Sequence, residues 1–120
     1  RAFASMTRNG ANAVIVLADS LFRQQRRQIG GLALKHRLPS SFMSIEFSDA
    51  GGLFVYSADQ IENFRRAAVF VDKILKGAKP GELPFELPTR YQLVINRKTA
   101  NALGLTIPQE LLLRADRVIE

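Results

Sequence analysis

The stretch Asn12-Ala-Val-Ile-Val-Leu-Ala-Asp-Ser20 decides the fold. Its apolar part, residues 12–18, is nearly continuous and rich in β-branched residues, which is typical of a strand covered on both faces. Strands of this kind occur in parallel sheets. Asp19 and Ser20 then end the strand and are placed to cap a helix. The pattern therefore predicts a strand–helix unit of an α/β sheet.

The rest of the chain continues this alternation. A helix is predicted over residues 21–37, ending before Pro39. Apolar residues spaced by three and four predict a clear amphipathic helix over residues 59–76, ended by Gly77. The other predicted elements are a short helix around residues 3–7, strands at 40–45, 53–57 and 91–96, a polar loop at 46–52, a short helix at 98–103 and a last turn from Pro108. We expect an α/β fold with a three-layer, open, mostly parallel, Rossmann-like sheet.

Glycine and proline mark two less regular places. Gly30-Gly31 lies inside the helix predicted over residues 21–37, and each glycine costs about 1 kcal/mol relative to Ala in a helix, which argues against an unbroken helix. Residues 78–88 contain three prolines, too many for a helix or a central strand. That segment is predicted to be an extended connector.

Composition excludes several kinds of chemistry. The 120 residues include no Cys and one His, so thiol nucleophiles, disulfides, Cys-ligated zinc and a multi-His metal site within the chain are excluded. No nucleophile elbow, phosphate-binding loop or dinucleotide fingerprint is present. The lone His36 is expected to cap helix carbonyls. The longest apolar run, residues 13–18, is much shorter than the roughly 20 residues of a membrane-spanning helix. We expect neither an enzyme nor a cofactor.

The net charge of +6 is spread evenly, with +3 in residues 1–60 and +3 in residues 61–120. One basic cluster comprises Arg23, Arg26, Arg27, Lys35, His36 and Arg37. On a helix its arginines fall mostly away from the apolar side, and no aromatic stacking set accompanies them. The cluster is therefore interpreted as a solvated helix face, and no nucleic-acid partner is expected.

Candidate ligand residues follow from the topology, because ligands of open α/β sheets bind beyond the carboxyl ends of the strands. Asp19 could bind a ligand ammonium or hydroxyl group, or it could only cap a helix. Tyr56 could stack on an apolar or aromatic ligand, or pack its ring on the protein surface. Glu46 is interpreted as a solvated loop residue.

Several motifs resemble a known family. They are Ala13-Val-Ile-Val-Leu-Ala-Asp19, Glu46-Phe-Ser-Asp-Ala-Gly-Gly-Leu53, Arg65-Arg-Ala-Ala-Val-Phe-Val-Asp-Lys-Ile-Leu-Lys-Gly-Ala-Lys-Pro80 and Leu93-Val-Ile-Asn-Arg-Lys-Thr-Ala-Asn-Ala-Leu-Gly-Leu-Thr-Ile-Pro108. In this order they resemble the C-terminal part of an ABC transporter substrate-binding protein, of the two-lobed periplasmic-binding-protein family with a type I-like fold. The resemblance covers nearly the whole chain.

The resemblance implies a division of the chain. Residues 1–57 would be the α/β core of one lobe, and residues 58–77 a helix that belongs with the other lobe. Residues 78–90 would be a proline-rich hinge connector, and residues 91–120 the return strand and C-terminal helices of the lobe.

The resemblance also implies a function and a site. Such proteins close around a small solute, for example an amino acid, by a hinge motion and deliver it to a membrane permease. The implied ligand-binding residues are Asp19, Ser20, Tyr56 and Ser57, where the family usually has Asp-Pro and Tyr-Gly. A periplasmic or cell-surface location is implied, although this chain contains no signal peptide.

Two other functions fit the residues. One is a cytoplasmic α/β regulatory or enzyme domain, since a fold does not determine a function. The other is an α/β module that binds no ligand and forms a homodimer through an exposed lobe surface, with the helix near residues 61–76 as the natural element to exchange.

Overall fold

The computed structural model describes residues 1–120 and divides them into two compact units. The α/β unit comprises Arg1–Ser57 and Gln92–Glu120. The α4 unit comprises Ala58–Tyr91. No helix in the structure combines the length and apolar character needed to cross a membrane.

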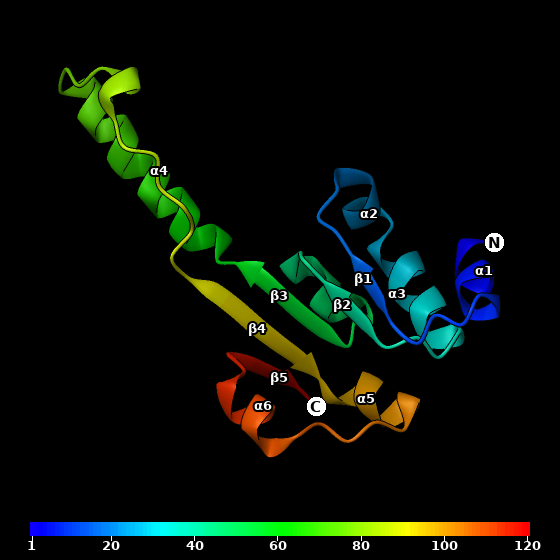
Figure 1. Ribbon diagram of the computed structural model, residues 1–120. Helices are drawn as coiled ribbons and strands as arrows, with labels where there is room; N and C mark the ends of the chain where they lie inside the picture. The colour runs from blue at the N-terminus through cyan, green and yellow to red at the C-terminus, as the bar shows by residue number, and fades with distance from the viewer. The chain divides into compact units, whose positions relative to one another are not determined.

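Helices and strands are interspersed along the chain (Figure 1). In order they are α1 (Ala2–Arg8), β1 (Val14–Val16), α2 (Ser20–Gln24), α3 (Arg26–Lys35), β2 (Ser40–Phe42), the 3₁₀ helix η1 (Ile45–Ala50), β3 (Phe54–Ala58), α4 (Gln60–Leu75), the 3₁₀ helix η2 (Pro80–Glu82), β4 (Tyr91–Asn96), α5 (Arg97–Leu103), α6 (Gln109–Arg114) and β5 (Arg117–Ile119).

The five strands form one sheet in the order β1-β2-β3-β4-β5. The pairs β1–β2, β2–β3 and β4–β5 are parallel, and the arrows of β3 and β4 run in opposite directions (Figure 1). The register sets Val16 opposite Phe42, and Phe42 opposite Val55. The predicted mixed α/β fold with a mostly parallel sheet is confirmed.

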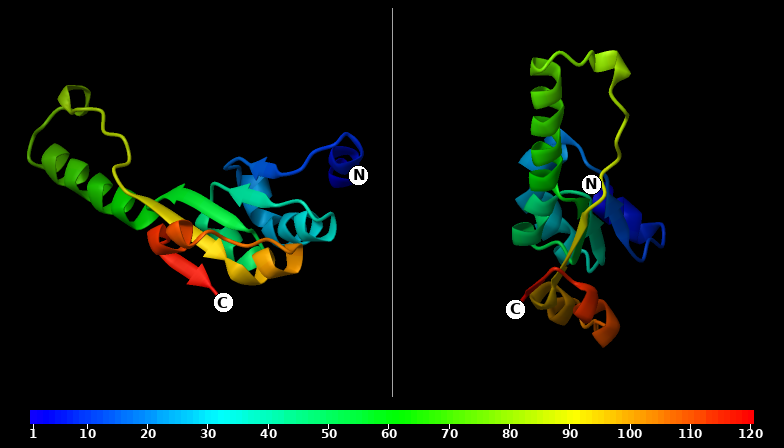
Figure 2. Two further views of the ribbon diagram at one scale, coloured as in Figure 1. Left: turned by 60° about the horizontal axis from the view of Figure 1, so that its bottom comes forward. Right: turned by 90° about the vertical axis from the view of Figure 1, so that its left-hand side faces the viewer.

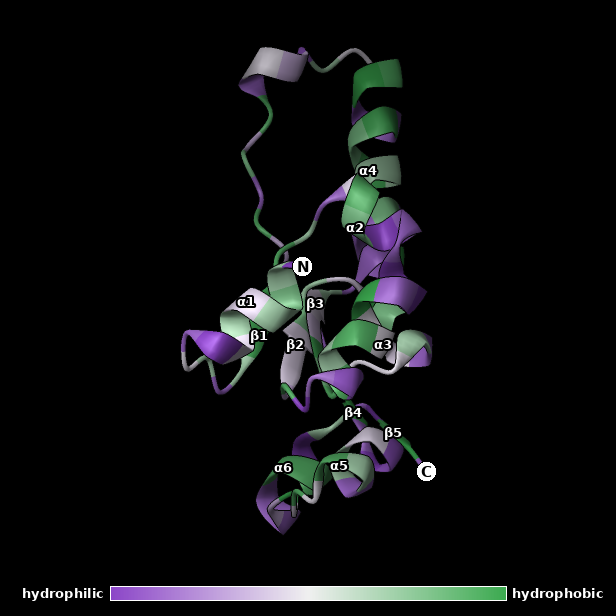
Figure 3. Cartoon of the chain, turned by 90° about the vertical axis from the view of Figure 1, so that its right-hand side faces the viewer, coloured by the Kyte–Doolittle hydropathy of each residue, from purple (hydrophilic) through white to green (hydrophobic).

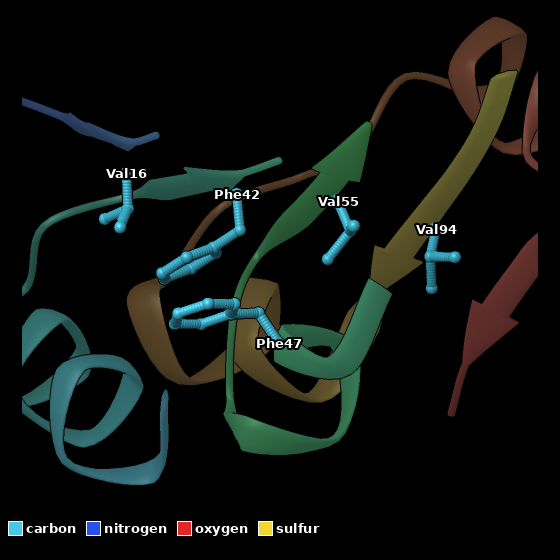
Figure 4. Packing of buried hydrophobic residues seen from close by; sticks show 5 residues of the cluster. All are labelled: Val16, Phe42, Phe47, Val55 and Val94. Carbon is cyan, nitrogen blue, oxygen red and sulfur yellow. The ribbon is translucent and has the colours of Figure 1, made fainter. Parts of the chain in front are cut away.

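The core of the α/β unit lies between one face of the sheet and the helices. Side chains from four strands point toward Phe47, which η1 contributes (Figure 4). The rings of Phe42 and Phe47 stack at a centroid distance of 4.2 Å and an interplanar angle of 15°. A second cluster contains Leu53, Ala100 and Leu103. These buried side chains hold β2, β3, η1 and α5 together.

The first strand forms where the sequence predicts it, but its burial differs from the prediction. Val16 is buried, whereas Ile15 and Leu17 are exposed. The prediction of a strand covered on both faces is therefore wrong. The physical reason is its position, because β1 is an edge strand whose buried side chain joins the core while its opposite face meets solvent.

The helix predicted over residues 21–37 consists of two helices, α2 and α3, separated at Gln25. The two glycines do not break α3, although they were expected to weaken it. Gly30 is buried, and a Cβ there would overlap the carbonyl oxygen of Ala50. The missing side chain thus lets α3 approach η1, whereas Gly31 has open space around its Cβ position.

Most other predicted elements are confirmed. The helix α4 ends at Leu75, two residues before the left-handed Gly77, and β4 covers the predicted residues 91–96. The segment predicted as a polar loop is instead the 3₁₀ helix η1, because Phe47 anchors it in the core. Strand β5 has no counterpart among the predictions, since three residues starting with Arg117 are too short to give a pattern.

Candidate functional site

The carboxyl ends of β1, β2 and β3 lie at one edge of the sheet because the three strands are parallel. Extending their register by one residue aligns Leu17, Met43 and Tyr56 across neighbouring strands. All three side chains are 48% to 62% exposed, on the face opposite the buried core. We call Leu17, Met43 and Tyr56 the apolar row. Together they form a solvent-facing apolar surface at the place where open α/β sheets bind ligands.

Asp19 has a definite structural role at this edge. Its Oδ1 accepts hydrogen bonds from the backbone N–H groups of Leu21, at 2.8 Å, and Phe22, at 3.3 Å. Asp19 is thus the N-cap of α2, as one of the two interpretations predicted. Ser20 is the first residue of α2, and both residues are exposed. Their exposure leaves them accessible to a ligand, and the cap holds the Asp19 carboxylate in one orientation.

Tyr56 and Ser57 point to opposite faces of the sheet, since successive residues of a strand alternate. Tyr56 is exposed, whereas Ser57 is 7% exposed and lies on the core side. The buried Ser57 Oγ has no hydrogen-bond partner in the structure. These two predicted site residues can therefore share a ligand only beyond the end of β3, where both faces are within reach.

The loops around this edge are joined by an ion pair. Arg23 of α2 lies 3.6 Å from the Glu46 carboxylate of η1, and both side chains are about half exposed. Glu46, interpreted from the sequence as a solvated loop residue, is partly exposed but lies in η1 and is paired with Arg23. Arg23 belongs to the basic cluster, most of whose residues are exposed, as expected for a solvated face. At the end of α3, His36 stacks on Phe3 at 6.2 Å.

Sequence reasoning missed Leu17 and Met43. Their signal was present but ambiguous, because residues 12–18 are apolar throughout and give no alternation to mark the exposed face. Met43 follows a three-residue strand whose register cannot be read from its own sequence. Pairing with neighbouring strands decided which side chains form the apolar row.

The α4 unit contains a separate hollow of about 280 Å³ between α4 and the returning connector. At its side, the Arg66 guanidinium donates to both carboxylate oxygens of Glu86 at 2.6 to 3.0 Å. These hydrogen bonds and the charge of Glu86 raise the pKa of Arg66. The hollow is lined by Glu62, Asn63, Arg66, Ala67, Phe70, Glu86, Leu87, Pro88 and Thr89. The structure has no group of three or more His, Cys, Asp or Glu side chains that could hold a metal ion.

Comparisons with known proteins extend the geometric findings. Two solved structures have the same fold over 98% of this chain and 39% of their own. One is a conserved domain protein from Vibrio cholerae O1 biovar El Tor, with a TM-score of 0.87 and 24% identity. The other is an ABC domain from Streptococcus pneumonia in complex with L-Trp, with a TM-score of 0.86 and 27% identity.

A third structure is the ligand-free, open form of a substrate binding protein with adhesive properties from Clostridium difficile. It matches with a TM-score of 0.72 and 16% identity over 98% of this chain. The chain spans about two fifths of the length of these structures. A search of curated proteins finds no match. The family model for ABC transporter substrate binding proteins matches residues 1–119. The chain therefore belongs to the ABC transporter substrate binding protein family.

Proposed function

We propose that this chain supplies one lobe of a solute receptor for an ABC-type uptake transporter. The observation that carries the proposal is the exposed apolar row, followed two residues after Leu17 by the oriented carboxylate of Asp19, in a chain of this family. An amino acid offers an ammonium group for a carboxylate and a side chain for an apolar surface. The similarity to a domain in complex with L-Trp supports an amino acid as the solute.

In this proposal Asp19, Ser20, Tyr56 and Ser57 line one wall of the cleft. Tyr56 would stack on the solute from the exposed face of β3, with Leu17 and Met43 extending the apolar surface. Ser57 would contact the solute only if its unpartnered hydroxyl, which is buried on the core side of β3, became uncovered on binding. A second wall has to close over the solute, because small ligands are normally buried over most of their surface.

The remaining parts of the proposal concern the whole receptor. The α4 helix would pack on the other lobe, and the connector at residues 78–90 would act as a hinge during closure. The closed receptor would deliver its solute to a membrane permease from the periplasm or the cell surface. Its role would be binding and release, with no bond chemistry.

A thermal-shift screen tests the site directly. The 120-residue chain is mixed with L-tryptophan, other amino acids, glucose and AMP at increasing concentrations. We expect a dose-dependent rise in the melting midpoint with an amino acid at millimolar concentration, and none with glucose or AMP. No rise with any amino acid would contradict solute binding by this chain, and a rise with AMP alone would favour the regulatory or enzyme domain.

Variants place the solute at the proposed wall. Tyr56→Ala and Asp19→Asn should each reduce the amino-acid-induced shift, whereas Phe85→Ala, a change of a solvent-exposed aromatic residue in the α4 unit, should leave it unchanged. Ser57→Ala tests whether the hydroxyl contacts the ligand or only affects the stability of the chain. Loss of the shift with unchanged stability would support ligand contact, and an unchanged shift would remove Ser57 from the site.

A further inference from the structure

The amino-acid solute of the proposed function carries two charges, and the proposed wall matches only one of them. Asp19 offers a carboxylate for the ammonium group, and the apolar row offers a surface for the side chain. The carboxylate of the solute also needs a partner, because burying an unpaired charge is costly. Arginine suits this task best, since its planar guanidinium can donate two parallel hydrogen bonds to one carboxylate.

Arg23 is the cation that the α/β unit offers beyond the ends of its three parallel strands. It lies in α2, which follows the carboxyl end of β1 (Figure 1). Residues 17–25, between β1 and α3, contain no other Lys or Arg, and residues 43–53, between β2 and β3, contain none at all. Because ligands of open α/β sheets bind beyond these strand ends, Arg23 is the candidate partner for the solute carboxylate.

Other cations that follow or precede the neighbouring strands have partners or positions of their own. Arg90 precedes β4, and its side chain lies 3.5 Å from the buried carboxylate of Asp59. Arg66 of α4 is bound by Glu86 on the connector that runs back along the helix (Figure 2). Arg114 precedes β5, at the opposite side of the sheet from β1. Each of these three is a weaker candidate than Arg23.

Arg23 also differs from the two arginines that begin α3. All three belong to the hydrophilic stretch of residues 23–28, which is coloured purple between α2 and α3 in Figure 3. Arg26 is turned back toward α2, because its guanidinium donates to the Arg23 carbonyl oxygen at 3.2 Å. Arg27 is exposed on α3. Only Arg23 reaches across to the segment after β2, where its guanidinium lies 3.6 Å from Glu46.

Arg23 follows Asp19 by one helical turn. Its backbone N–H donates to the Asp19 carbonyl oxygen at 2.9 Å. Residues four apart on a helix lie on the same face, with Cβ atoms about 6 Å apart. Both capping hydrogen bonds of Asp19 use Oδ1, which leaves Oδ2 for an ammonium group. The two charges of an α-amino acid are bonded to one carbon, so a carboxylate and a guanidinium on one helix face suit both of them.

The ion pair with Glu46 orients Arg23 without occupying its donors. The distance of 3.6 Å between Arg23 Nη1 and Glu46 Oε1 is longer than a hydrogen bond. The two side chains are 55% and 41% exposed, and a pair this exposed contributes little to stability. The five N–H groups of the guanidinium can therefore turn to a carboxylate that arrives with the solute.

We propose that Arg23 binds the α-carboxylate of the solute while Asp19 binds its ammonium group. The inference rests on the proposed function and narrows its solute to free α-amino acids, which carry both charged groups. Amino acid amides, which keep the ammonium group and the side chain but have no carboxylate, should bind more weakly. One member of the basic cluster thus has a role beyond that of a solvated helix face.

Comparison of an amino acid with its amide tests the contact. L-tryptophan and L-leucine are titrated into the 120-residue chain beside L-tryptophanamide and L-leucinamide, and we compare the concentrations that give the same rise in the melting midpoint. We expect the free acid to need roughly tenfold less than its amide, because hydrogen bonds between charged groups are strong.

The outcomes separate this inference from the proposed function. A rise with the free acids that their amides match at equal concentration would overturn the inference and leave the proposed function standing. No rise with these or any other amino acids would contradict solute binding by the chain, and the inference would fail with it.

Variants assign the preference for the free acid to one side chain. Arg23→Gln should abolish it, so that acid and amide act at equal concentrations. Arg23→Lys keeps the charge but loses the two-pronged contact, and should retain a preference of about threefold. Arg27→Gln, at a neighbouring exposed arginine, is the matched control and should keep the full preference. A preference that survives Arg23→Gln, or that Arg27→Gln abolishes equally, would overturn the inference.

Glu46→Gln distinguishes contact with the solute from support by the ion pair. It breaks the pair but leaves the cation of Arg23, so part of the preference, about threefold, should remain. Identical losses in Glu46→Gln and Arg23→Gln would mean that the ion pair supports the site and that Arg23 does not contact the solute. The melting midpoint without solute should stay close to that of the parent chain in both variants, because the pair is exposed.

Discussion

The two units of this chain differ in how their residues are stabilised. All the buried hydrophobic side chains belong to the α/β unit, where four strands and η1 surround one core. In the α4 unit only Asp59 is buried, and it is a polar helix cap. One unit is therefore held by packing, and the other by local hydrogen bonds and ion pairs.

This difference shows what helix formation requires. Helix α4 has a strong heptad, an N-cap at Asp59 and a left-handed glycine at its end. These local features account for its boundaries, but a helix of this length has only marginal stability in water without tertiary contacts. The α/β unit should thus unfold cooperatively, whereas α4, none of whose residues is buried, should open locally.

The largest effect is expected from a change in the core. Phe42 is 0% exposed and stacks on Phe47, so Phe42→Ala should lower the free energy of unfolding by about 3–5 kcal/mol. Phe85 is 95% exposed in the α4 unit, and Phe85→Ala should change the free energy of unfolding by less than about 0.5 kcal/mol. Urea denaturation of both variants measures the two changes in the free energy of unfolding. Equal losses of stability in the two variants would show that the two units share one core.

Two adjacent glycines give a sharper test within the α/β unit. Gly30→Ala forces a methyl group against the Ala50 carbonyl and should cost about 1–3 kcal/mol. Gly31→Ala has open space and should stabilise α3 by up to about 1 kcal/mol. Thermal unfolding should therefore shift the two midpoints in opposite directions. A stable Gly30→Ala variant would mean that α3 does not pack closely on η1.

The cap of α4 tests local stability. Asp59 Oδ1 accepts from the N–H groups of Ile61 and Glu62, and its carboxylate lies 3.5 Å from Arg90. Asp59→Ala should destabilise α4 by about 1 kcal/mol, which is roughly a fivefold faster hydrogen exchange of its amides. Asp59→Asn keeps the capping oxygen and should stay close to the parent chain. If Asp59→Ala also changes the hydrogen exchange of the β2 amides by the same factor as that of the α4 amides, the two units do not open independently.

The smallest effect is expected for the Arg66–Glu86 pair. Arg66→Lys loses the two-pronged contact with Glu86 and should free the connector near residues 85–87 without a measurable change in urea denaturation. NMR chemical shifts of the connector amides would report the change. Arg65→Lys, at a neighbouring arginine that pairs with Glu62 of the same helix, is the control. Connector shifts that are the same in both variants would argue against the ion pair.

Elements with a strong local pattern were predictable from the sequence. The heptad gave the position of α4, and Tyr91–Asn96 is the strand that its apolar run predicts. Asp19 was predictable as a cap from its place after a strand. The division at Gln25 was not, because no residue there breaks a helix on its own. Leu17 and Met43 were missed at the site for a related reason, since their exposure depends on the strands beside them.

The sequence by itself determined the alternation of strands and helices as far as α5, the cap at Asp19 and the resemblance to the family, because these depend on short-range patterns. Only the tertiary structure decided which face of β1 is buried, why Gly30 carries no side chain, and that Tyr56 and Ser57 face opposite ways. The physical reason is that burial is set by neighbours distant in the chain, through strand pairing and helix packing.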